Sequence, residues 1–160
     1  MEKIHFRAAN ISDAEIYYKW INDKIVRKQS FNSDLIKWDE HLAWFKDKIS
    51  DPRYYFYIFH NENNNNIGQV RIQKIDNKNS IIGVSIDENY RGYGYGAKIL
   101  EIACNEHLSK IPDIIINAYI KQENKISKLI FEKAGFNFFQ NTIYKNFNCF
   151  HYIFYANRKV

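Results

Sequence analysis

Cysteine is scarce in this chain: only Cys104 and Cys149 occur among its 160 residues. The two lie far apart in the sequence, and neither has a second cysteine at CxxC spacing. This pattern excludes a disulfide-rich scaffold and argues against a cysteine metal site. We therefore expect two buried thiols and no bound metal.

Long apolar runs and clusters of charge are missing as well. No stretch of 18 consecutive apolar residues is present, and the segment 1–6 holds no apolar signal core. The formal net charge is +5, but the basic residues are scattered, with no run longer than Arg158-Lys159. We expect a cytoplasmic protein that binds neither membranes nor nucleic acid.

Aromatic side chains, in contrast, are abundant, with 12 Tyr and 12 Phe. That many rings can fill the core of a sheet and still leave some to line a ligand site. The hydrophobic share of 46% and the charged share of 26% are typical of a globular chain. We expect one domain over 1–160, and the mild positive charge suits an anionic small molecule.

The hydrophobic pattern predicts a mixed α+β domain without internal repeats. The sequence Ser12-Asp13-Ala14-Glu15 has capping-box spacing and predicts a helix that continues through Trp20. Further helices are expected at 38–49, 94–108 and 124–134, and strands at 3–8, 54–59, 67–75, 80–87, 113–120, 136–144 and 147–155. The middle strands should form an antiparallel meander.

A glycine-rich loop, Arg91-Gly92-Tyr93-Gly94-Tyr95-Gly96, follows a predicted strand and opens a predicted helix. The first amides of a helix have no partners within the helix and lie at its positive end, so they bind phosphate. Glycines allow the backbone to approach the ligand closely, and Arg91 can add a charge-assisted contact. The loop therefore predicts a phosphate site.

Three other kinds of glycine-rich segment are alternatives to this interpretation of the loop. A P-loop needs Gly-Lys-Ser/Thr, which Gly96-Ala97-Lys98 does not supply. A dinucleotide fingerprint needs GxGxxG and an acidic residue about 20 positions later, where this chain has Asn117. A glycine-rich turn without any ligand stays possible on local sequence alone.

Two motifs together resemble the GNAT superfamily of N-acetyltransferases. The loop resembles motif A, whose pattern is Q/R-x-x-G-x-G/A, and the segment from Asn124 to Phe136 resembles the family's N-x-x-S/A-x-x-L/I-Y/F-E-K-x-G-F helix. The order of the elements fits over the whole chain. The resemblance implies a mostly antiparallel, seven-stranded mixed sheet flanked by helices, splayed between strands four and five, with acetyl-CoA as cosubstrate.

The resemblance also implies which residues hold acetyl-CoA. The pantetheine arm would lie along Ser85, Ile86 and Asp87, and the pyrophosphate on Arg91, Gly92, Tyr93, Gly94, Tyr95, Gly96 and Ala97. The helix after strand five would contribute Asn124, Ser127 and Phe131. Helical spacing places these three on one side and Ile126, Leu129 and Ile130 on the opposite, core-facing side. Many family members have Tyr where this chain has Phe131, which cannot donate a proton to the departing thiolate.

A narrower resemblance concerns the acceptor. The segments W-x-N-D-x-x-V-R (20–27), S-F (30–31), H-x-x-W-F (41–45) and I-G-Q-V-R (67–71) resemble enzymes that acetylate the 4-amino group of a UDP-linked amino sugar in pseudaminic acid biosynthesis. Candidate substrate residues are Asn22, Arg27, His41, Trp44, Gln69, Arg71 and Tyr90. Arginine and histidine would meet the diphosphate, and the aromatic rings would stack. Surface ion pairs for the arginines and core packing for His41 are the simpler alternatives.

Direct transfer requires an oxyanion donor and a base. The strand-four amide near Ile86 is the expected donor. His41 and Asp87 are the candidate bases, with Glu123 as a further carboxylate, and Asn117 and Tyr119 share a strand face where they can hold a water. A ribosomal-protein or aminoglycoside-type N-acetyltransferase and a catalytically inactive CoA-binding regulator remain the alternatives. The aromatic C-terminal strands suggest a possible homodimer.

Overall fold

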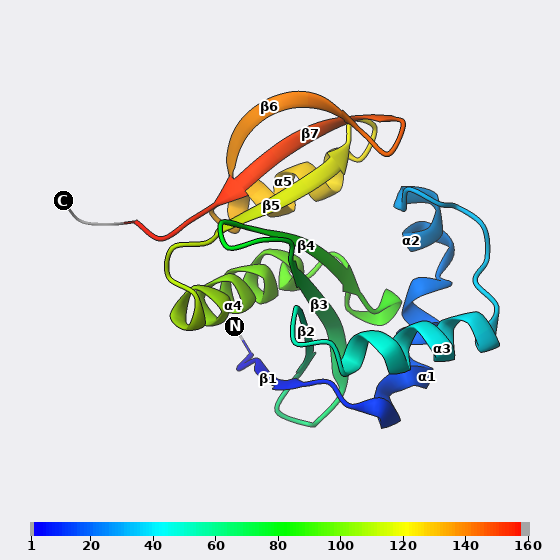
Figure 1. The fold of residues 1–160 in the computed structure, drawn as a ribbon. Helices are drawn as coiled ribbons and strands as arrows, with labels where there is room; N and C mark the ends of the chain where they lie inside the picture. The colour runs from blue at the N-terminus through cyan, green and yellow to red at the C-terminus, as the bar shows by residue number, and fades with distance from the viewer. Residues whose placement is uncertain (1, 158–160) are drawn as a thin grey trace.

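Seven strands form one sheet in the computed structural model, which describes residues 2–157 (Figure 1). The strands are β1 (His5–Ala8), β2 (Tyr54–His60), β3 (Asn66–Lys74), β4 (Asn79–Ile86), β5 (Ile115–Lys121), β6 (Asn137–Tyr144) and β7 (Phe147–Phe154). Their spatial order is β1-β2-β3-β4-β5-β7-β6, and every neighbouring pair is antiparallel except β4 and β5. The predicted mixed, mostly antiparallel sheet is confirmed.

Four of the five α-helices agree with the sequence pattern, and α2 was not predicted. The helices are α1 (Ala14–Ile21), α2 (Lys24–Gln29), α3 (Trp38–Ile49), α4 (Tyr95–Lys110) and α5 (Lys125–Lys133), with 3-10 turns η1 (Ile11–Asp13) and η2 (Glu88–Tyr90). The predicted capping box at Ser12 was wrong. The capping box belongs to η1, where Asn10 is the N-cap and its amide donates to Asp13, and α1 then begins at Ala14 with Asp13 as its N-cap.

Both faces of the sheet are covered (Figure 1). On one face α1 and α3 pack against Phe56 and Ile58 of β2. On the other face α4 and α5 pack against Tyr57, Phe59 and the apolar residues of β3, β4 and β5. Because successive side chains of a strand point to opposite faces, β2 has to be apolar along its length, as its sequence is.

The parallel pair is short, and this opens the sheet. β4 and β5 are paired only where Asn79, Ser80 and Ile81 lie opposite Ile115, Ile116 and Asn117. β4 continues to Ile86 and β5 to Lys121 without further pairing between them. The expected splay between the fourth and fifth strands is therefore confirmed, and it leaves backbone groups of both strands without a neighbouring strand.

The predicted faces of α5 were wrong in part, since of the three residues expected in the core only Ile130 packs against it. Ile126 and Leu129, expected in the core, are 74% and 56% exposed, whereas Phe131, expected beside the ligand, is only 5% exposed. Phe131 packs edge-on against Phe136, with ring centroids 5.0 Å apart. The apolar core attracts the large ring, and helical spacing alone does not fix which arc of a short helix faces the sheet.

Candidate active site

The unpaired edge of β4 presents backbone amides to the splay. The amide of Asp87 bonds to the Ile67 carbonyl, at 2.9 Å, and so points to β3. Because the direction of backbone groups alternates along a strand, the amides of Val84 and Ile86 point the other way, towards the gap. The Ile86 carbonyl confirms this direction, since it accepts a bond from Arg91 Nε at 3.1 Å, on the side away from β3.

Across the gap, β5 presents a matching edge. The Ile115 amide donates to the Lys78 carbonyl at 2.8 Å, on the β4 side, whereas the Gln122 amide donates to Asn148 at 3.0 Å, on the β7 side. By alternation, the backbone of Tyr119 faces the gap beyond the last β4–β5 pair. The splay thus has one hydrogen-bonding edge on each side, which suits an extended chain that carries amides, such as pantetheine.

The glycine loop has the backbone that a phosphate site needs. Gly92 and Gly94 both have φ +83°, a left-handed conformation that a side chain disfavours, and Gly94 is the N-cap of α4. The first turn of α4 contains no acidic residue that would repel an anion. A Cβ on Gly96 would lie 3.1 Å from Ile130 Cγ2, so this glycine allows α4 and α5 to pack closely.

The other residues of the loop have separate environments. Tyr93 is 72% exposed, and Tyr95 donates its hydroxyl to Glu2 at 2.9 Å. Tyr90, predicted to contact the acceptor, instead lies edge-on against Tyr95, 6.0 Å between centroids, and packs on the α4 and α5 side of the sheet. This position places Tyr90 beside the cosubstrate loop.

Arg91 does not point freely from the loop. Its Nη2 lies 2.9 Å from Asp23 Oδ1, and Asp23 is the N-cap of α2. Burial alone would raise the pKa of Asp23, but hydrogen bonds from Arg91 and from the Val26 and Ile25 amides hold it below its ordinary value. With Nε on the Ile86 carbonyl and Nη2 on Asp23, the predicted phosphate contact of Arg91 would use Nη1.

The carboxylate of Asp87, a predicted base, is occupied by hydrogen bonds that stabilise the fold. It accepts hydrogen bonds from Trp20 Nε1 at 2.9 Å, from Lys19 Nζ at 3.2 Å and from the Asn89 amide at 3.0 Å. Burial alone would raise the pKa of this carboxyl group, but these bonds, first that of Trp20, hold the pKa below its usual value. The Asn89 side chain donates to it as well, at 3.0 Å, and a carboxylate with a low pKa and four donors is a poor proton acceptor.

His41, the other predicted base, lies inside the core between α1 and α3. It is 1% exposed, and its Nε2 donates to the Ala14 carbonyl at 2.8 Å. Rings of Tyr18, Trp38 and Phe45 surround it at centroid distances of 5.4, 5.8 and 5.6 Å. Burial lowers its pKa, so the ring is neutral and packed, and the structure does not favour contact with a substrate.

Two predicted acceptor residues, Asn22 and Arg27, fold the segment around α2 instead. The Asn22 amide exchanges two bonds of 2.9 Å with the backbone of Ile36. The guanidinium of Arg27 donates to the carbonyls of Ile21, Asn32 and Asp34 and to Ser30 Oγ. A guanidinium with four of its five N–H donors used in this way has little capacity left for a diphosphate.

Arg71, Trp44 and Gln69 remain suitable for an acceptor. Arg71 lies on the α1 and α3 face, with its guanidinium carbon 5.3 Å from the centroid of a Trp44 ring. It forms no ion pair with any residue that the structure describes. Gln69 donates to Ser85 Oγ at 2.7 Å, while its buried Oε1 has no partner within residues 2–157. Arg71 and Gln69 therefore lie on the same face of the splayed sheet as Trp44.

The surroundings of Arg71 are phenolic rather than acidic. Burial lowers its pKa, and the phenols of Tyr17, Tyr54 and Tyr144 act in the opposite direction. The side chain is nevertheless exposed to solvent. An arginine that is both surrounded by protein and open to solvent, without a carboxylate partner, is available to a bound anion.

Sequence reasoning missed a row of stacked rings beside the splay. Tyr119 lies 4.0 Å from Tyr144 and 4.5 Å from His151 by ring centroids. His151 Nε2 donates to Asn117 Oδ1 at 2.8 Å, since the Asn117 amide nitrogen itself donates to the Ser80 carbonyl at 3.1 Å. Burial lowers the pKa of His151, so its ring is neutral near pH 7. The alternation of side chains along 148–153 was the sequence signal for these rings. Identifying the rings they stack on also required the register of this strand with β5, which the sequence does not give.

At the start of α5, Asn124 and Ser127 are bonded to each other. Asn124 Oδ1 accepts from the Ser127 amide at 3.1 Å, and its amide nitrogen donates to Ser127 Oγ at 2.9 Å. The pair therefore caps the helix. It leaves further hydrogen-bonding capacity at the helix start, as the predicted cosubstrate contact requires.

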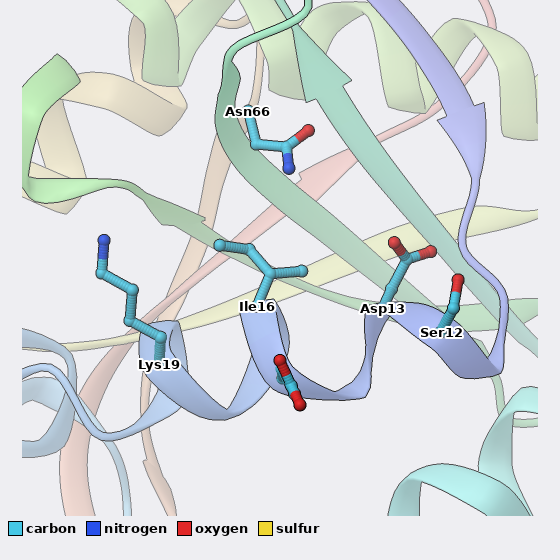
Figure 2. A pocket seen from close by; sticks show the side chains of 6 residues that line it. Ser12, Asp13, Ile16, Lys19 and Asn66 are labelled. Carbon is cyan, nitrogen blue, oxygen red and sulfur yellow. The ribbon is translucent and has the colours of Figure 1, made fainter.

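A separate hollow of about 430 Å³ lies beside α1 (Figure 2). It is lined by Ser12, Asp13, Glu15, Ile16, Lys19 and Asn66. Its two carboxylates oppose an anionic ligand, and Asp13 is already held by Arg7 at 2.7 Å.

Over residues 2–157 no helix is long and apolar enough to span a membrane. The same residues form no cluster of metal ligands of the His, Cys, Asp and Glu types.

A splayed sheet with hydrogen-bonding edges, next to a glycine-lined helix start, is the architecture of an acyl-CoA-binding α+β enzyme. Spermidine N-acetyltransferase from Vibrio cholerae, solved with CoA and spermine, has the same fold, with a TM-score of 0.83 at 15% identity over 94% of this chain and 93% of that chain. AAC(6')-Ib with ribostamycin and Coenzyme A gives 0.81 at 16% identity over 95% and 93%. No curated protein sequence matches.

The family is established by sequence as well. The family model for the acetyltransferase (GNAT) domain matches residues 3–137, so the chain belongs to the GNAT acetyltransferases. It is an acetyl-CoA-dependent N-acetyltransferase that acts on an amine.

Proposed function

We propose that this enzyme transfers the acetyl group of acetyl-CoA to a primary amine on an anionic acceptor, namely the 4-amino group of a UDP-linked amino sugar. The observation that carries the proposal is Arg71, an accessible cation beside the splay that has no carboxylate partner in the described chain. A diphosphate supplies the missing partner through charge-assisted bonds.

The structural relatives named above bind spermine and ribostamycin in their solved complexes. Both molecules carry several amines, and a polycation binds best where carboxylates line the site. Among the residues that the structure describes, the titratable groups that act on Arg71 are phenols and include no carboxylate. This charge pattern favours an anionic acceptor over a polyamine or an aminoglycoside.

The aromatic neighbours of Arg71 suit the rest of such an acceptor. Trp44 lies under the guanidinium, and the stacked Tyr119 and Tyr144 rings lie towards β5. Aromatic faces bind the apolar side of a sugar ring or a uracil base by stacking. Gln69, with one unpartnered oxygen, can accept a bond from a sugar hydroxyl.

For the cosubstrate, we propose that Ser85, Ile86 and Asp87 lie along the pantetheine arm, with the Ile86 amide as hydrogen-bond donor. The pyrophosphate lies on the backbone from Arg91 to Ala97, where the amides of a helix start point at it. Asn124 and Ser127 bond the cosubstrate at the start of α5. Phe131 contributes apolar contact only, since its ring is in the core.

The transfer proceeds in one addition and one elimination. The neutral amine nitrogen attacks the thioester carbonyl carbon, and the carbonyl electron pair moves to oxygen, where the Ile86 amide stabilises the oxyanion. The oxyanion then reforms the carbonyl as the carbon–sulfur bond breaks and CoA leaves as thiolate. The proton lost by nitrogen passes to a water held near Tyr119 and Asn117. A thiolate needs no dedicated acid near pH 8, which agrees with Phe131 at the usual tyrosine position.

A thiol-release assay with a panel of amines tests the proposal. The panel contains a UDP-linked 4-amino sugar, spermidine, an aminoglycoside and a short peptide with a free N-terminus. We expect turnover with the UDP-sugar and a KM roughly 10- to 100-fold higher in Arg71→Ala, because a charge-assisted bond is lost. Arg53→Ala is the matched control, since Arg53 is exposed and pairs with Asp51.

Other outcomes would identify other functions. Turnover with the peptide alone would identify a protein N-terminal acetyltransferase, and turnover with spermidine or the aminoglycoside alone would show a cationic acceptor. Thermal protection by CoA without thiol release from any amine would indicate a CoA-binding regulator. Any of these results would overturn the nucleotide-sugar proposal.

We also propose that the enzyme forms a homodimer through β6, the last strand of the sheet. Phe138, Phe139 and Ile143 of this strand are 53%, 57% and 73% exposed, which is unusual for an edge strand in a monomer. Sedimentation analysis of Ile143→Lys against the unchanged chain tests this, and a monomeric unchanged chain would refute it.

A further inference from the structure

Gly83 occupies a strand position that needs no glycine for the fold. The other five glycines have a structural reason: Gly92, Gly94 and Gly135 have positive φ, and a Cβ on Gly68 or Gly96 would lie 2.5 Å from Ser85 O or 3.1 Å from Ile130 Cγ2. A Cβ on Gly83 would meet only Arg71 Nη2, at 4.0 Å, and the backbone there is ordinary. Glycine inside a strand weakens it, so this one marks a place where a ligand approaches the backbone.

The register places Gly83 between two candidate acceptor residues. It lies directly opposite Arg71 in the β3–β4 pair. The last β4–β5 pair is Ile81 with Asn117, so two residues further on Gly83 and Tyr119 stand at the same level on the two sides of the splay. All three residues belong to the face that α1 and α3 cover in part, because side chains alternate with period two.

The two side chains beside this bare stretch of backbone are held in place. Tyr119 is fixed in the stack with Tyr144 and His151, at 4.0 and 4.5 Å. Arg71 rests on Trp44, 5.3 Å from the ring centroid, and its Nη2 reaches over Gly83. A cation on one side and a polar aromatic ring on the other therefore border an open patch of β4, next to the edge where the thioester is expected.

We propose that Gly83 is the floor of the acceptor site, and that Arg71 and Tyr119 form its opposite walls and so select an amine that carries an anionic group. The anion binds Arg71, the body of the acceptor crosses the bare backbone of β4, and the amine points into the splay. This inference rests on the proposed N-acetyl transfer to an anionic amine and names the residue that sets which acceptors fit.

Gly83→Ala and Gly83→Val test the proposal. The alanine variant folds, since its Cβ has room and its backbone angles suit any residue, and we expect its Tm to equal or exceed that of the unchanged chain. We expect the acceptor KM to rise roughly tenfold with alanine and further with valine, because each added methyl occupies substrate space. The Kd for acetyl-CoA, measured calorimetrically without acceptor, should stay within about twofold.

Ile72→Val is the matched control, because Ile72 lies on the opposite, fully buried face of β3. It should lower Tm without changing the acceptor KM. An unchanged acceptor KM in both Gly83 variants, with the unchanged chain active on the same amine, would overturn the inference and leave the proposed function standing. Absence of transfer by the unchanged chain to every anionic amine would refute the proposed function instead.

Discussion

Arg91 Nη2 and Asp23 Oδ1 are 2.9 Å apart, and this ion pair joins the cosubstrate loop to the N-cap of α2. A second link runs parallel to it, from Asp87 at the end of β4 to Trp20 and Lys19 at the end of α1. The helices on the proposed acceptor side are thus tied directly to the segment proposed to hold the pyrophosphate. Arg91 uses Nε for the Ile86 carbonyl and Nη2 for Asp23, which leaves Nη1 for a phosphate, but the Asp23 carboxylate offsets its positive charge.

The negative charge of Asp23 therefore opposes binding of the anionic cosubstrate, and Asp23→Asn should strengthen that binding. Asparagine keeps the N-cap bonds of α2 but removes the charge that offsets Arg91. Partly exposed pairs contribute up to about 1 kcal/mol, so we expect the Kd for acetyl-CoA to fall two- to fivefold by calorimetry. Asp23→Ala, which also removes the cap, separates helix stability from charge. A Kd that does not fall would show that the charge of Asp23 does not weaken cosubstrate binding.

The phosphate loop should depend on the backbone of Gly94, whose φ is +83°. Alanine in this conformation costs about 1–2 kcal/mol and shifts the first amides of α4. Gly135→Ala is the control, since Gly135 has φ +100° at the far end of α5. Both variants should lose stability by urea unfolding, Gly135→Ala at least as much as Gly94→Ala, because its Cβ would also lie 3.2 Å from Phe154 Cε2. Only Gly94→Ala should raise the Kd for acetyl-CoA, by roughly tenfold or more.

Asp87 should prove to be a structural carboxylate and not the base. Asp87→Asn weakens the bonds from Trp20 and Lys19 and should reduce the free energy of unfolding by about 1–3 kcal/mol. The shape of kcat/KM against pH should stay the same, as it should in His41→Gln. If kcat/KM no longer fell at low pH in one of these variants, the substituted residue would be the base after all.

Acid should destabilise the fold through His107. This residue is fully buried between α4 and β4, where its Nε2 meets Ser80 Oγ at 2.9 Å, and burial lowers its pKa to about 4 from an ordinary 6.5. The unfolded chain therefore takes up the proton first. Stability is complete above pH 6.5 and falls progressively towards pH 4, by about 2 kcal/mol at pH 5 from this group.

His107→Gln isolates this contribution, because glutamine cannot take up a proton in this range. Urea unfolding at pH 7 and pH 5 should show that the advantage of the unchanged chain over the variant shrinks by about 2 kcal/mol at the lower pH. An advantage that is equal at both pH values would mean that the buried ring is protonated as readily as in the unfolded chain.

The sequence by itself determined the element order, the glycine loop and the helix start at which we propose a phosphate binds. These features depend on short-range physics: the alternation of side chains, the backbone freedom of Gly92 and Gly94, and the unpaired amides of the first helical turn. Each can be read from a few neighbouring residues.

Only the tertiary structure decided what the polar side chains do. Arg27 and His41 suited a substrate by residue type, yet packing assigned the first to a loop and the second to the core. The row of Arg71, Gly83 and Tyr119 arises from the register of β3, β4 and β5, and β5 follows β4 only after the whole of α4. Register and burial are set by contacts across the whole sheet, so no local pattern encodes them.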